Sequence, residues 1–279
     1  MKLSQTDIKR IVEFVKKEPR TVQDVSKLIG RSWVTTESYL QQIKEDTGLI
    51  DIKTFRKGSQ AALKIVFPAS SSNVSSDDLK DRIFQKIRIG RTKNDLDFMG
   101  IYQFIPASNK KAYSEQYEEG EITKGYPISH LLRRAENYVY VFSGNLSFLN
   151  TKENGKSVLS VMEELLKKKI SVKILCRVNL ASLSNISKLS LLIKKYPDLI
   201  EVRHSYHPLR GFLIDGKLGR FKNEESALKY KKGELVKNTR IFYEFYDHDW
   251  ISWLEKVFWS LFRVSLDYES RAKEIRKIF

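Results

Sequence analysis

Three side chains that can act on or bind a phosphate group lie in one short segment of the second half of the chain. They are His207, Arg210 and Asp215. An imidazole can attack phosphorus, and a guanidinium binds phosphate oxygens through paired hydrogen bonds. Arg210 and Asp215, with Asn145 from an earlier segment, form a candidate anion pocket in which Asp215 pairs with Arg210. The alternative is an ordinary ion pair at the end of a strand.

Residue types that bind metals or cofactors are sparse. Cys176 is the single cysteine, which excludes an internal disulfide and a cysteine-rich zinc site. The four histidines lack the spacing of metal-binding motifs. We therefore expect no metal and no cofactor. Cys176 lies in an apolar segment, where we expect an unreactive core residue.

Basic residues dominate the charge of the chain. There are 50 Lys and Arg against 34 Asp and Glu, which gives a formal net charge of +16. This excess favours a polyanionic partner. Apolar runs fall short of the roughly 20 residues that span a membrane. The first residues also lack the apolar stretch of a secretory signal. We expect a globular, cytoplasmic protein.

The N-terminal quarter of the chain contains three short helical patterns followed by two strand patterns. In the third helix Thr36, Leu40 and Ile43 share one face, which we expect to be buried. Residues 49–55 and 61–67 read as the two strands of a hairpin with a polar tip. We expect the three helices to begin after the capping residues Thr6, Thr21 and Ser32. They should end at Pro19, Gly30 and Gly48, respectively.

Three helices followed by a hairpin is the order of a winged helix-turn-helix domain, whose third helix can enter the major groove of DNA. Polar side chains on that helix can reach base edges, and basic residues of the wing can contact phosphates. The alternative is the same fold used for protein contacts. The candidate DNA-binding residues are Arg31, Ser32, Thr35, Ser38, Gln41 and Gln42 around the third helix, and Lys53, Arg56 and Lys57 in the wing.

A small, polar stretch at residues 69–79 is typical of a linker. It divides the chain into an expected winged-helix domain of residues 1–68 and a larger domain of residues 80–279. In the larger part, strand and helix patterns alternate, which favours an α/β layered domain. Strands are expected at 138–142, 171–176, 199–203, 211–215, 217–221 and 241–246, a long helix capped by Asp249 follows, and residues 94–125 have no clear assignment.

The larger part resembles the phospholipase D-like fold. Residues 131–145 (LLRRAENYVYVFSGN), 172–175 (VKIL) and 206–217 (YHPLRGFLIDGK) carry the resemblance. Active members of that family have the motif His-x-Lys-x4-Asp, in which the histidine attacks phosphorus, the lysine holds phosphate oxygens and the aspartate supports the site. Two such motifs meet within a chain or across a dimer. The resemblance therefore implies a phosphate-binding edge on the larger domain.

This chain departs from the motif at its nucleophile. Spacing from Asp215 puts Arg210 at the lysine position and Pro208 at the histidine position. His207 lies one residue early, and a shift of one residue on a strand turns a side chain to the opposite face. The sequence contains no His-x-Lys triplet. We therefore predict a catalytically degenerate domain. The alternative is a phospholipase D-type nuclease that uses His207, Arg210 and Asp215.

A winged helix followed by such a domain is similar to the TrmB-type archaeal transcription regulators, and Arg31–Leu40 resembles third helices of archaeal winged-helix regulators. The resemblance implies a second domain that dimerises or senses a small molecule. We predict a dimeric DNA-binding regulator whose partners are double-stranded DNA and a small-molecule or anionic effector, without membrane contact. A nuclease and a structural nucleic-acid-binding protein without a defined operator are the alternatives.

Overall fold

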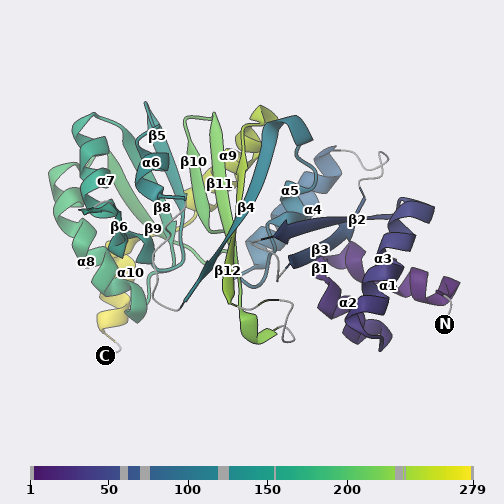
Figure 1. Ribbon diagram of the computed structural model, residues 1–279. Coiled ribbons are helices and arrows are strands. Elements are labelled where there is room, and N and C mark those ends of the chain that lie inside the picture. The colour runs from purple at the N-terminus through teal and green to yellow at the C-terminus, as the bar shows by residue number, and fades with distance from the viewer. Residues whose placement is uncertain are drawn as a thin grey trace.

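The structure is a computed structural model that describes residues 3–56, 62–69, 76–118, 126–153, 155–229, 235 and 237–277. Helices and two main sheets organise these residues (Figure 1). A three-stranded sheet lies near the N-terminus, and an eight-stranded sheet lies in the larger part of the molecule. The α/β class expected from the sequence is confirmed.

The N-terminal part packs three helices against the three-stranded sheet, whose strand order is β1-β3-β2. Its elements are α1 (Gln5–Lys17), β1 (Arg20–Thr21), α2 (Val22–Ile29), α3 (Trp33–Thr47), β2 (Ile50–Arg56) and β3 (Ala62–Pro68). This is the winged-helix order that the sequence predicted. Strand β1, which pairs with β3, was not expected, because two residues are too few to show a strand pattern.

Local hydrogen bonds and glycines set the ends of α2 and α3 where the sequence placed them. The Ser32 side chain accepts the Thr35 N–H at 3.2 Å, and the Thr21 side chain forms a capping box at the start of α2. Gly30 and Gly48 follow the two helices with φ of 65° and 60°, a left-handed conformation that costs glycine little.

Two helix starts differ from the prediction. The N-cap of α1 is Ser4 rather than Thr6, because the Ser4 side chain accepts the N–H of Asp7 at 3.0 Å. Helix α9 (His248–Arg263) is capped by Asp247 rather than Asp249. The sequence offered two polar residues near each start, and spacing alone did not distinguish them.

The larger sheet has the strand order β13-β9-β8-β5-β10-β11-β12-β4. Strands β5, β8 and β9 run parallel, and the other neighbours pair antiparallel. The strands are β4 (Lys110–Tyr117), β5 (Tyr138–Phe142), β8 (Ser171–Cys176), β9 (Ile200–His204), β10 (Gly211–Ile214), β11 (Leu218–Glu225), β12 (Asn238–Phe245) and β13 (Leu266–Asp267). A separate pair consists of β6 (Lys152–Glu153) and β7 (Lys156–Ser157).

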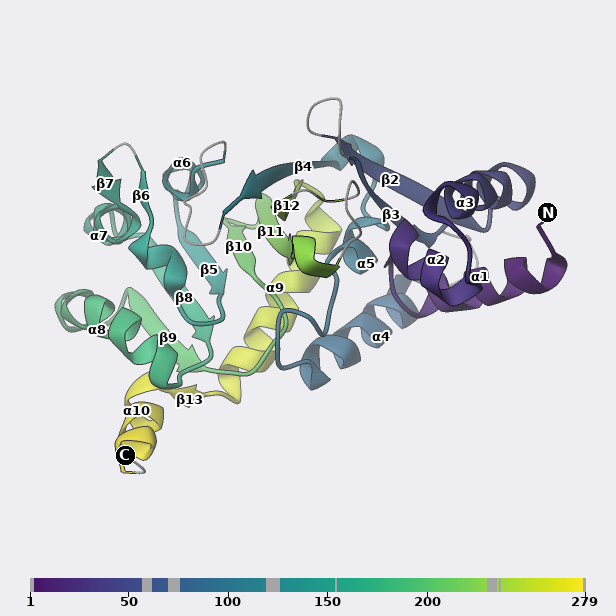
Figure 2. The same cartoon turned by 60° about the horizontal axis from the view of Figure 1, so that its bottom comes forward.

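Helices cover both faces of the larger sheet, as Figure 2 shows. One face packs against α7 and α8, and the other against α9, beside which α4 lies. The helices are α4 (Ser76–Ile89), α5 (Met99–Tyr102), α6 (Ile128–Leu132), α7 (Val158–Lys167), α8 (Leu180–Lys195), α9 and α10 (Tyr268–Arg276). Helix α5 and strand β4 lie within residues 94–125, which the sequence left unassigned.

Aromatic residues fill the core between the sheet and α9. Tyr140 and Phe142 of β5 lie against Phe258 of α9, with ring centroids 4.8 and 5.2 Å apart. Trp250 of α9 is also buried there. Cys176 is fully buried, and burial raises the pKa of its thiol to about 12. The expectation that Cys176 is a core residue is confirmed.

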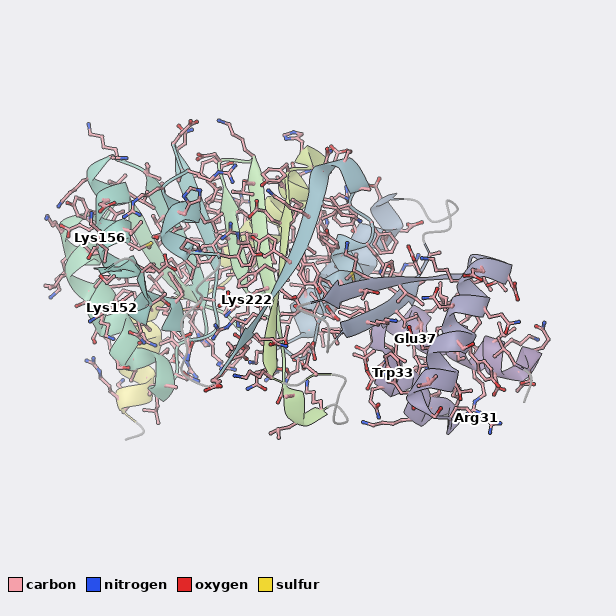
Figure 3. All side chains as sticks on the ribbon, in the orientation of Figure 1. Arg31, Trp33, Glu37, Lys152, Lys156 and Lys222 are labelled. Carbon is pink, nitrogen blue, oxygen red and sulfur yellow. The ribbon has the colours of Figure 1, made fainter. Side chains whose placement is uncertain are left out.

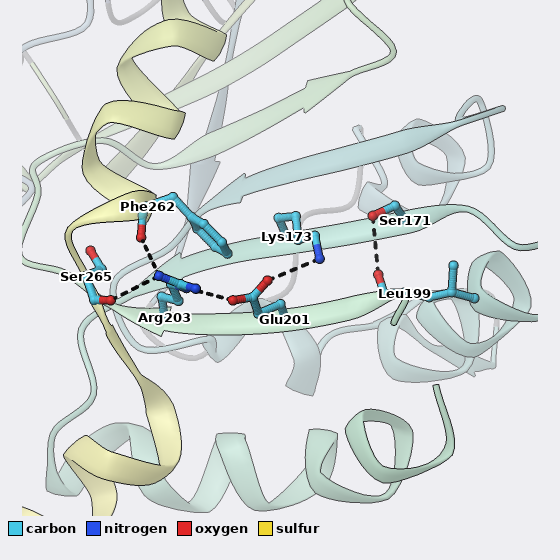
Figure 4. A network of polar contacts seen from close by, with 7 residues as sticks. All are labelled: Ser171, Lys173, Leu199, Glu201, Arg203, Phe262 and Ser265. Atoms are coloured by element: carbon cyan, nitrogen blue, oxygen red, sulfur yellow. Dashed lines mark hydrogen bonds and ion pairs between the residues drawn. The ribbon is translucent and has the colours of Figure 1, made fainter. Parts of the chain in front are cut away.

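An ion-pair chain attaches the end of α9 to the parallel strands (Figure 4). Glu201 of β9 accepts from Lys173 at 3.2 Å and from Arg203 at 2.7 Å. Arg203 also donates to the main-chain oxygens of Phe262 and Ser265, where α9 ends. These bonds fix the turn from α9 into β13.

The N-terminal part contacts the larger part through α4. Phe55 and Leu63 of the wing strands share a buried cluster with Ile83 and Ile87 of α4, and the Lys86 side chain donates to the main-chain oxygen of Lys17 at 2.8 Å. Residues 70–75 of the expected linker lie outside the described residues, and α4 begins at Ser76, before the expected end of the linker at residue 79. Among the described residues, no helix is both long and apolar enough to cross a membrane.

Candidate nucleic-acid interface and anion site

Helix α3 turns one face into the N-terminal core and leaves the other face open. Thr36, Tyr39, Leu40 and Ile43 are buried, so the expected inward face is confirmed. On the opposite side Val34, Ser38 and Gln42 follow one another at intervals of four residues and are exposed, with Val34 73% exposed. These three residues, which we name the α3 stripe, lie on one face of the helix.

The acidic residue in the first half of α3 is neutralised by an ion pair. Glu37 pairs with Lys64 of β3, which also lies 5.5 Å from the ring centre of Trp33. Burial lowers the pKa of Lys64. Figure 3 shows Arg31, Trp33 and Glu37 at the N-terminal end of α3. Exposed acidic residues follow in the last turns of the helix, at Glu45 and Asp46. An anionic partner is therefore favoured at the N-terminal half of α3.

The structure separates the candidate DNA-binding residues into groups. Ser38 and Gln42 are exposed, whereas Arg31 and Gln41 are partly buried. Ser32 is exposed and Thr35 partly buried, and their hydroxyls lie 2.8 Å apart, because Ser32 caps the helix. Lys53 of β2 is exposed. The Arg56 side chain and Lys57 lie outside the described residues.

Sequence reasoning missed Val34. It chose polar residues as groove readers, and Val34 was passed over although it shares the spacing of Ser38 and Gln42. An apolar side chain at such a position can contact the methyl group of thymine.

At the carboxyl ends of β5 and β8, His207 is buried rather than presented to solvent. It is 2% exposed, its Nε2 lies 3.3 Å from the main-chain oxygen of Leu175, and its ring packs edge-on against Phe142. Burial, with nearby arginine charge, lowers its pKa to about 3. Pro208, at the nucleophile position, is buried against Gly90. This burial does not favour the alternative role of His207 as a nucleophile, because a nucleophile must reach its substrate.

Arg210 lies at the same edge and packs against the backbone of Gly144, where a Cβ would approach its Nε to 2.8 Å. It donates to the main-chain oxygens of His207 and Leu209 at 3.1 and 2.6 Å. Arg177, the first residue after β8, has a buried Nε without a partner among the described residues. Burial and the neighbouring charge of Arg177 lower the pKa of Arg210 to about 10.

We name Arg177 and Arg210 the arginine pair. Within the described residues neither forms an ion pair, although their charges repel each other. Partly buried cations that repel each other are costly, and a bound anion would reduce that cost. Arg177 was missed from the sequence, although its place directly after a parallel strand is where α/β folds bind ligands.

Asp215 does not join this site. It lies at the other end of β10, about 16 Å away along the strand. Its carboxylate accepts the main-chain N–H groups of Glu136, Asn137 and Tyr138 at 2.6, 2.9 and 2.7 Å. The expected ion pair with Arg210 is wrong, because these three donors occupy the carboxylate. Asp215 instead fixes the turn that it forms with Gly216, where both residues have positive φ.

Asn145 follows Gly144, the residue against which Arg210 packs. Its side-chain oxygen accepts the N–H of Ser147, and its main-chain oxygen accepts from the Asn185 side chain at 2.8 Å. Of the candidate anion pocket, the structure thus keeps Arg210 and Asn145 at one edge and removes Asp215. Among the described residues, no group of three or more His, Cys, Asp or Glu could hold a metal ion.

No family model matches the chain, and no curated protein does. Among solved structures it is similar to TrmBL2, an archaeal chromatin protein described as showing a novel mode of DNA binding, with a TM-score of 0.42, 13% identity, and 95% of this chain and 94% of that one covered. It is also similar to Nuc, a phospholipase D family member from Salmonella typhimurium (TM-score 0.39, 11% identity, 57% and 98% covered), and to NucT from Helicobacter pylori (0.35, 10%, 57% and 99%). Both resemblances expected from the sequence are found among these structures.

Proposed function

We propose that the chain is a DNA-binding transcription regulator. In this proposal residues 1–68 bind duplex DNA, and residues 80–279 form a phospholipase D-like domain that dimerises and responds to an anionic effector. The observation that carries the proposal is the α3 stripe, an exposed row of Val34, Ser38 and Gln42 on the helix that a winged-helix domain places in the major groove.

The charge of the N-terminal part supports a duplex partner. Residues 1–68 contain 13 Lys and Arg against 8 Asp and Glu, which leaves +5. Lys53 is exposed on the wing, and Glu37 on α3 is neutralised by Lys64. Contacts of basic side chains with phosphates would supply much of the affinity, so binding should weaken steeply as salt rises.

The arginine pair supports an anionic effector in the larger domain. Neither guanidinium group forms an ion pair among the described residues, and the partner-free Nε of Arg177 can donate a hydrogen bond. In a dimer, the larger domains would hold two α3 helices one or more helical turns of DNA apart, on a pseudo-palindromic site.

The α3 stripe gives the direct test. In fluorescence anisotropy with labelled duplexes from the protein's own upstream region, Ser38→Glu with Gln42→Glu should weaken binding by about 100-fold or more, because two negative charges would face the DNA. Ser184→Glu with Ser187→Glu, on exposed positions of α8, is the charge-matched control and should bind like the unchanged protein. An equal loss of DNA affinity in both variants, or no loss in either, would refute the assignment of the α3 stripe to DNA binding.

Competition with unrelated DNA separates a regulator from a structural DNA-binding protein. A regulator should prefer its site by about a thousandfold or more, whereas a structural protein should show little preference. A nuclease that uses His207 is not favoured, because the ring is buried and bonded to the main chain. Cleavage of DNA that is lost in His207→Ala would reverse this judgement.

A further inference from the structure

A recess of about 730 Å³ lies at the opposite end of β10 from the arginine pair. The segment between α6 and β5, the end of α7 and the turn between β10 and β11 surround it. Ala135, Ile170, Ile214 and Leu218 also line it, but they are buried and leave a mainly polar surface open to a ligand. A recess of this volume is in the range that holds small organic ligands.

The rim of this recess is basic. Arg133, Arg134, Lys168 and Lys217 line it, against two carboxylates, Glu136 and Asp215. We name it the basic recess. Cationic groups around a concave recess suit a small ligand that carries an anionic group.

The carboxylates of the recess are already engaged. Asp215 accepts three main-chain N–H groups, and Glu136 pairs with Lys217 at 2.9 Å. Arg133 pairs with Glu164, outside the rim, at 3.1 Å.

Two cations of the recess remain available. Arg134 and Lys168 form no ion pair within the part of the chain that the structure describes. Arg134 lies 5.8 Å from the ring centre of Tyr246, a contact that leaves the guanidinium edge able to donate hydrogen bonds. These two residues are the donors that an incoming anion would meet.

We propose that the basic recess binds a phosphorylated small molecule, with its phosphates on Arg134 and Lys168. This site is distinct from DNA binding by α3 and from the arginine pair. The concave shape favours a small molecule over duplex DNA, which is bound by cations on surfaces that fit its grooves and backbone. The ligand would join α7 to the turn that Asp215 holds.

Calorimetric titration of the full-length chain tests the proposal with three probes: ADP, inorganic phosphate and adenosine. We expect ADP to bind more tightly than phosphate, and adenosine to bind weakly or not at all, because the phosphates supply the charged contacts. Arg134→Ala with Lys168→Ala should weaken ADP binding about tenfold or more. Lys194→Ala with Lys273→Ala, both at exposed positions outside the recess, is the charge-matched control and should leave ADP affinity unchanged.

Several outcomes would overturn the proposal. One is ADP affinity that is equal in the Arg134–Lys168 variant and the control, and another is adenosine binding as tightly as ADP. ADP binding that is lost in Arg177→Ala but kept in the recess variant would assign the nucleotide to the arginine pair. The recess variant could also lose affinity for duplex DNA while it keeps its affinity for ADP. That result would make the recess part of the DNA-contacting surface. None of these outcomes changes the DNA-binding test of the α3 variants, which therefore fails or succeeds separately.

Discussion

The α3 stripe and the arginine pair both offer groups for an anionic partner, but they present them differently. The stripe lies on an exposed helix whose inward face packs the N-terminal core. The arginine pair is partly buried at the edge of a sheet, against the backbone of Gly144. A convex helix can enter a groove of a large, rigid duplex, whereas recessed guanidinium groups can surround only a small anion or a single phosphate. The difference favours two ligands for the two regions.

The largest effect that we expect comes from the two ends of β10. Asp215→Ala should lower the free energy of unfolding by about 3 kcal/mol, because three main-chain N–H groups lose a charged acceptor. Arg177→Ala should leave stability unchanged or raise it, since it removes repulsion of Arg210. Urea denaturation measures both. A large loss in Arg177→Ala would show that the arginine pair is structural, and the contrast with Asp215 would fail.

A smaller effect on stability, which depends on pH, is expected from Asp97, which lies where the N-terminal part meets the larger part. Its carboxylate accepts from the Asn223 side chain and from the N–H of Met99, and Gly100 is near Pro19 of the N-terminal part. Burial raises the pKa of Asp97 from 3.8 to about 7, and the charge of Glu225 adds to this shift.

Because the folded state holds this proton more tightly, the contribution of Asp97 to stability is complete below pH 4 and is lost as pH rises toward 7. The loss should be on the order of 2 kcal/mol. Asp97→Asn, which mimics the protonated form, should flatten this part of the pH profile. The measurement is urea denaturation at pH 4.5 and 7.5, and parallel profiles for the two proteins would disprove the role of Asp97.

Removing the N-cap of α3 should lower the free energy of unfolding by about 1 kcal/mol more than a change in the α3 stripe. Ser32→Ala removes the N-cap that accepts the Thr35 N–H and should destabilise the protein by roughly that amount. Ser38→Ala should leave the unfolding midpoint unchanged, because Ser38 is exposed. Thermal unfolding followed by circular dichroism compares the two. If Ser38→Ala were as destabilising as Ser32→Ala, the stripe would have a structural role.

The smallest effect is on the salt dependence of DNA binding. Lys53→Ala should weaken binding only a few-fold and reduce the slope of log affinity against log salt by about 1, because one phosphate contact is lost. Lys194→Ala on α8 should keep the slope. Anisotropy titrations at several salt concentrations measure it, and identical slopes for all three proteins would remove Lys53 from the interface.

Much of the fold could be predicted because its signals are local. Strands β5 and β8 were placed to the residue, since short apolar runs end at polar residues. The caps Thr21 and Ser32 were also correct, because each bonds within its own first turn. Strand β4 was missed, since its burial depends on pairing with the distant β12.

The candidate site was predicted only in part, for the same reason. Arg210 and Asp215 are close in sequence, yet an intervening strand places them at opposite ends of the sheet. Arg177 and Arg210 are far apart in sequence, but β8 and β10 lie on either side of β5 and bring them to the same edge of the sheet. Spacing along the chain could not show which of these pairs would meet. The burial of His207 could not be predicted from strand alternation, because it lies in the segment between β9 and β10 and on neither strand.

Site-specific cross-linking tests the central claim most directly. Cys176 is buried, so a cysteine placed on the surface can be labelled selectively with a thiol-reactive photo-cross-linker. We expect Gln42→Cys, on the α3 stripe, to cross-link to bound duplex DNA, and Lys194→Cys, on α8, not to do so. Equal cross-linking from both positions, or DNA captured from position 194 alone, would contradict the proposal that α3 contacts DNA.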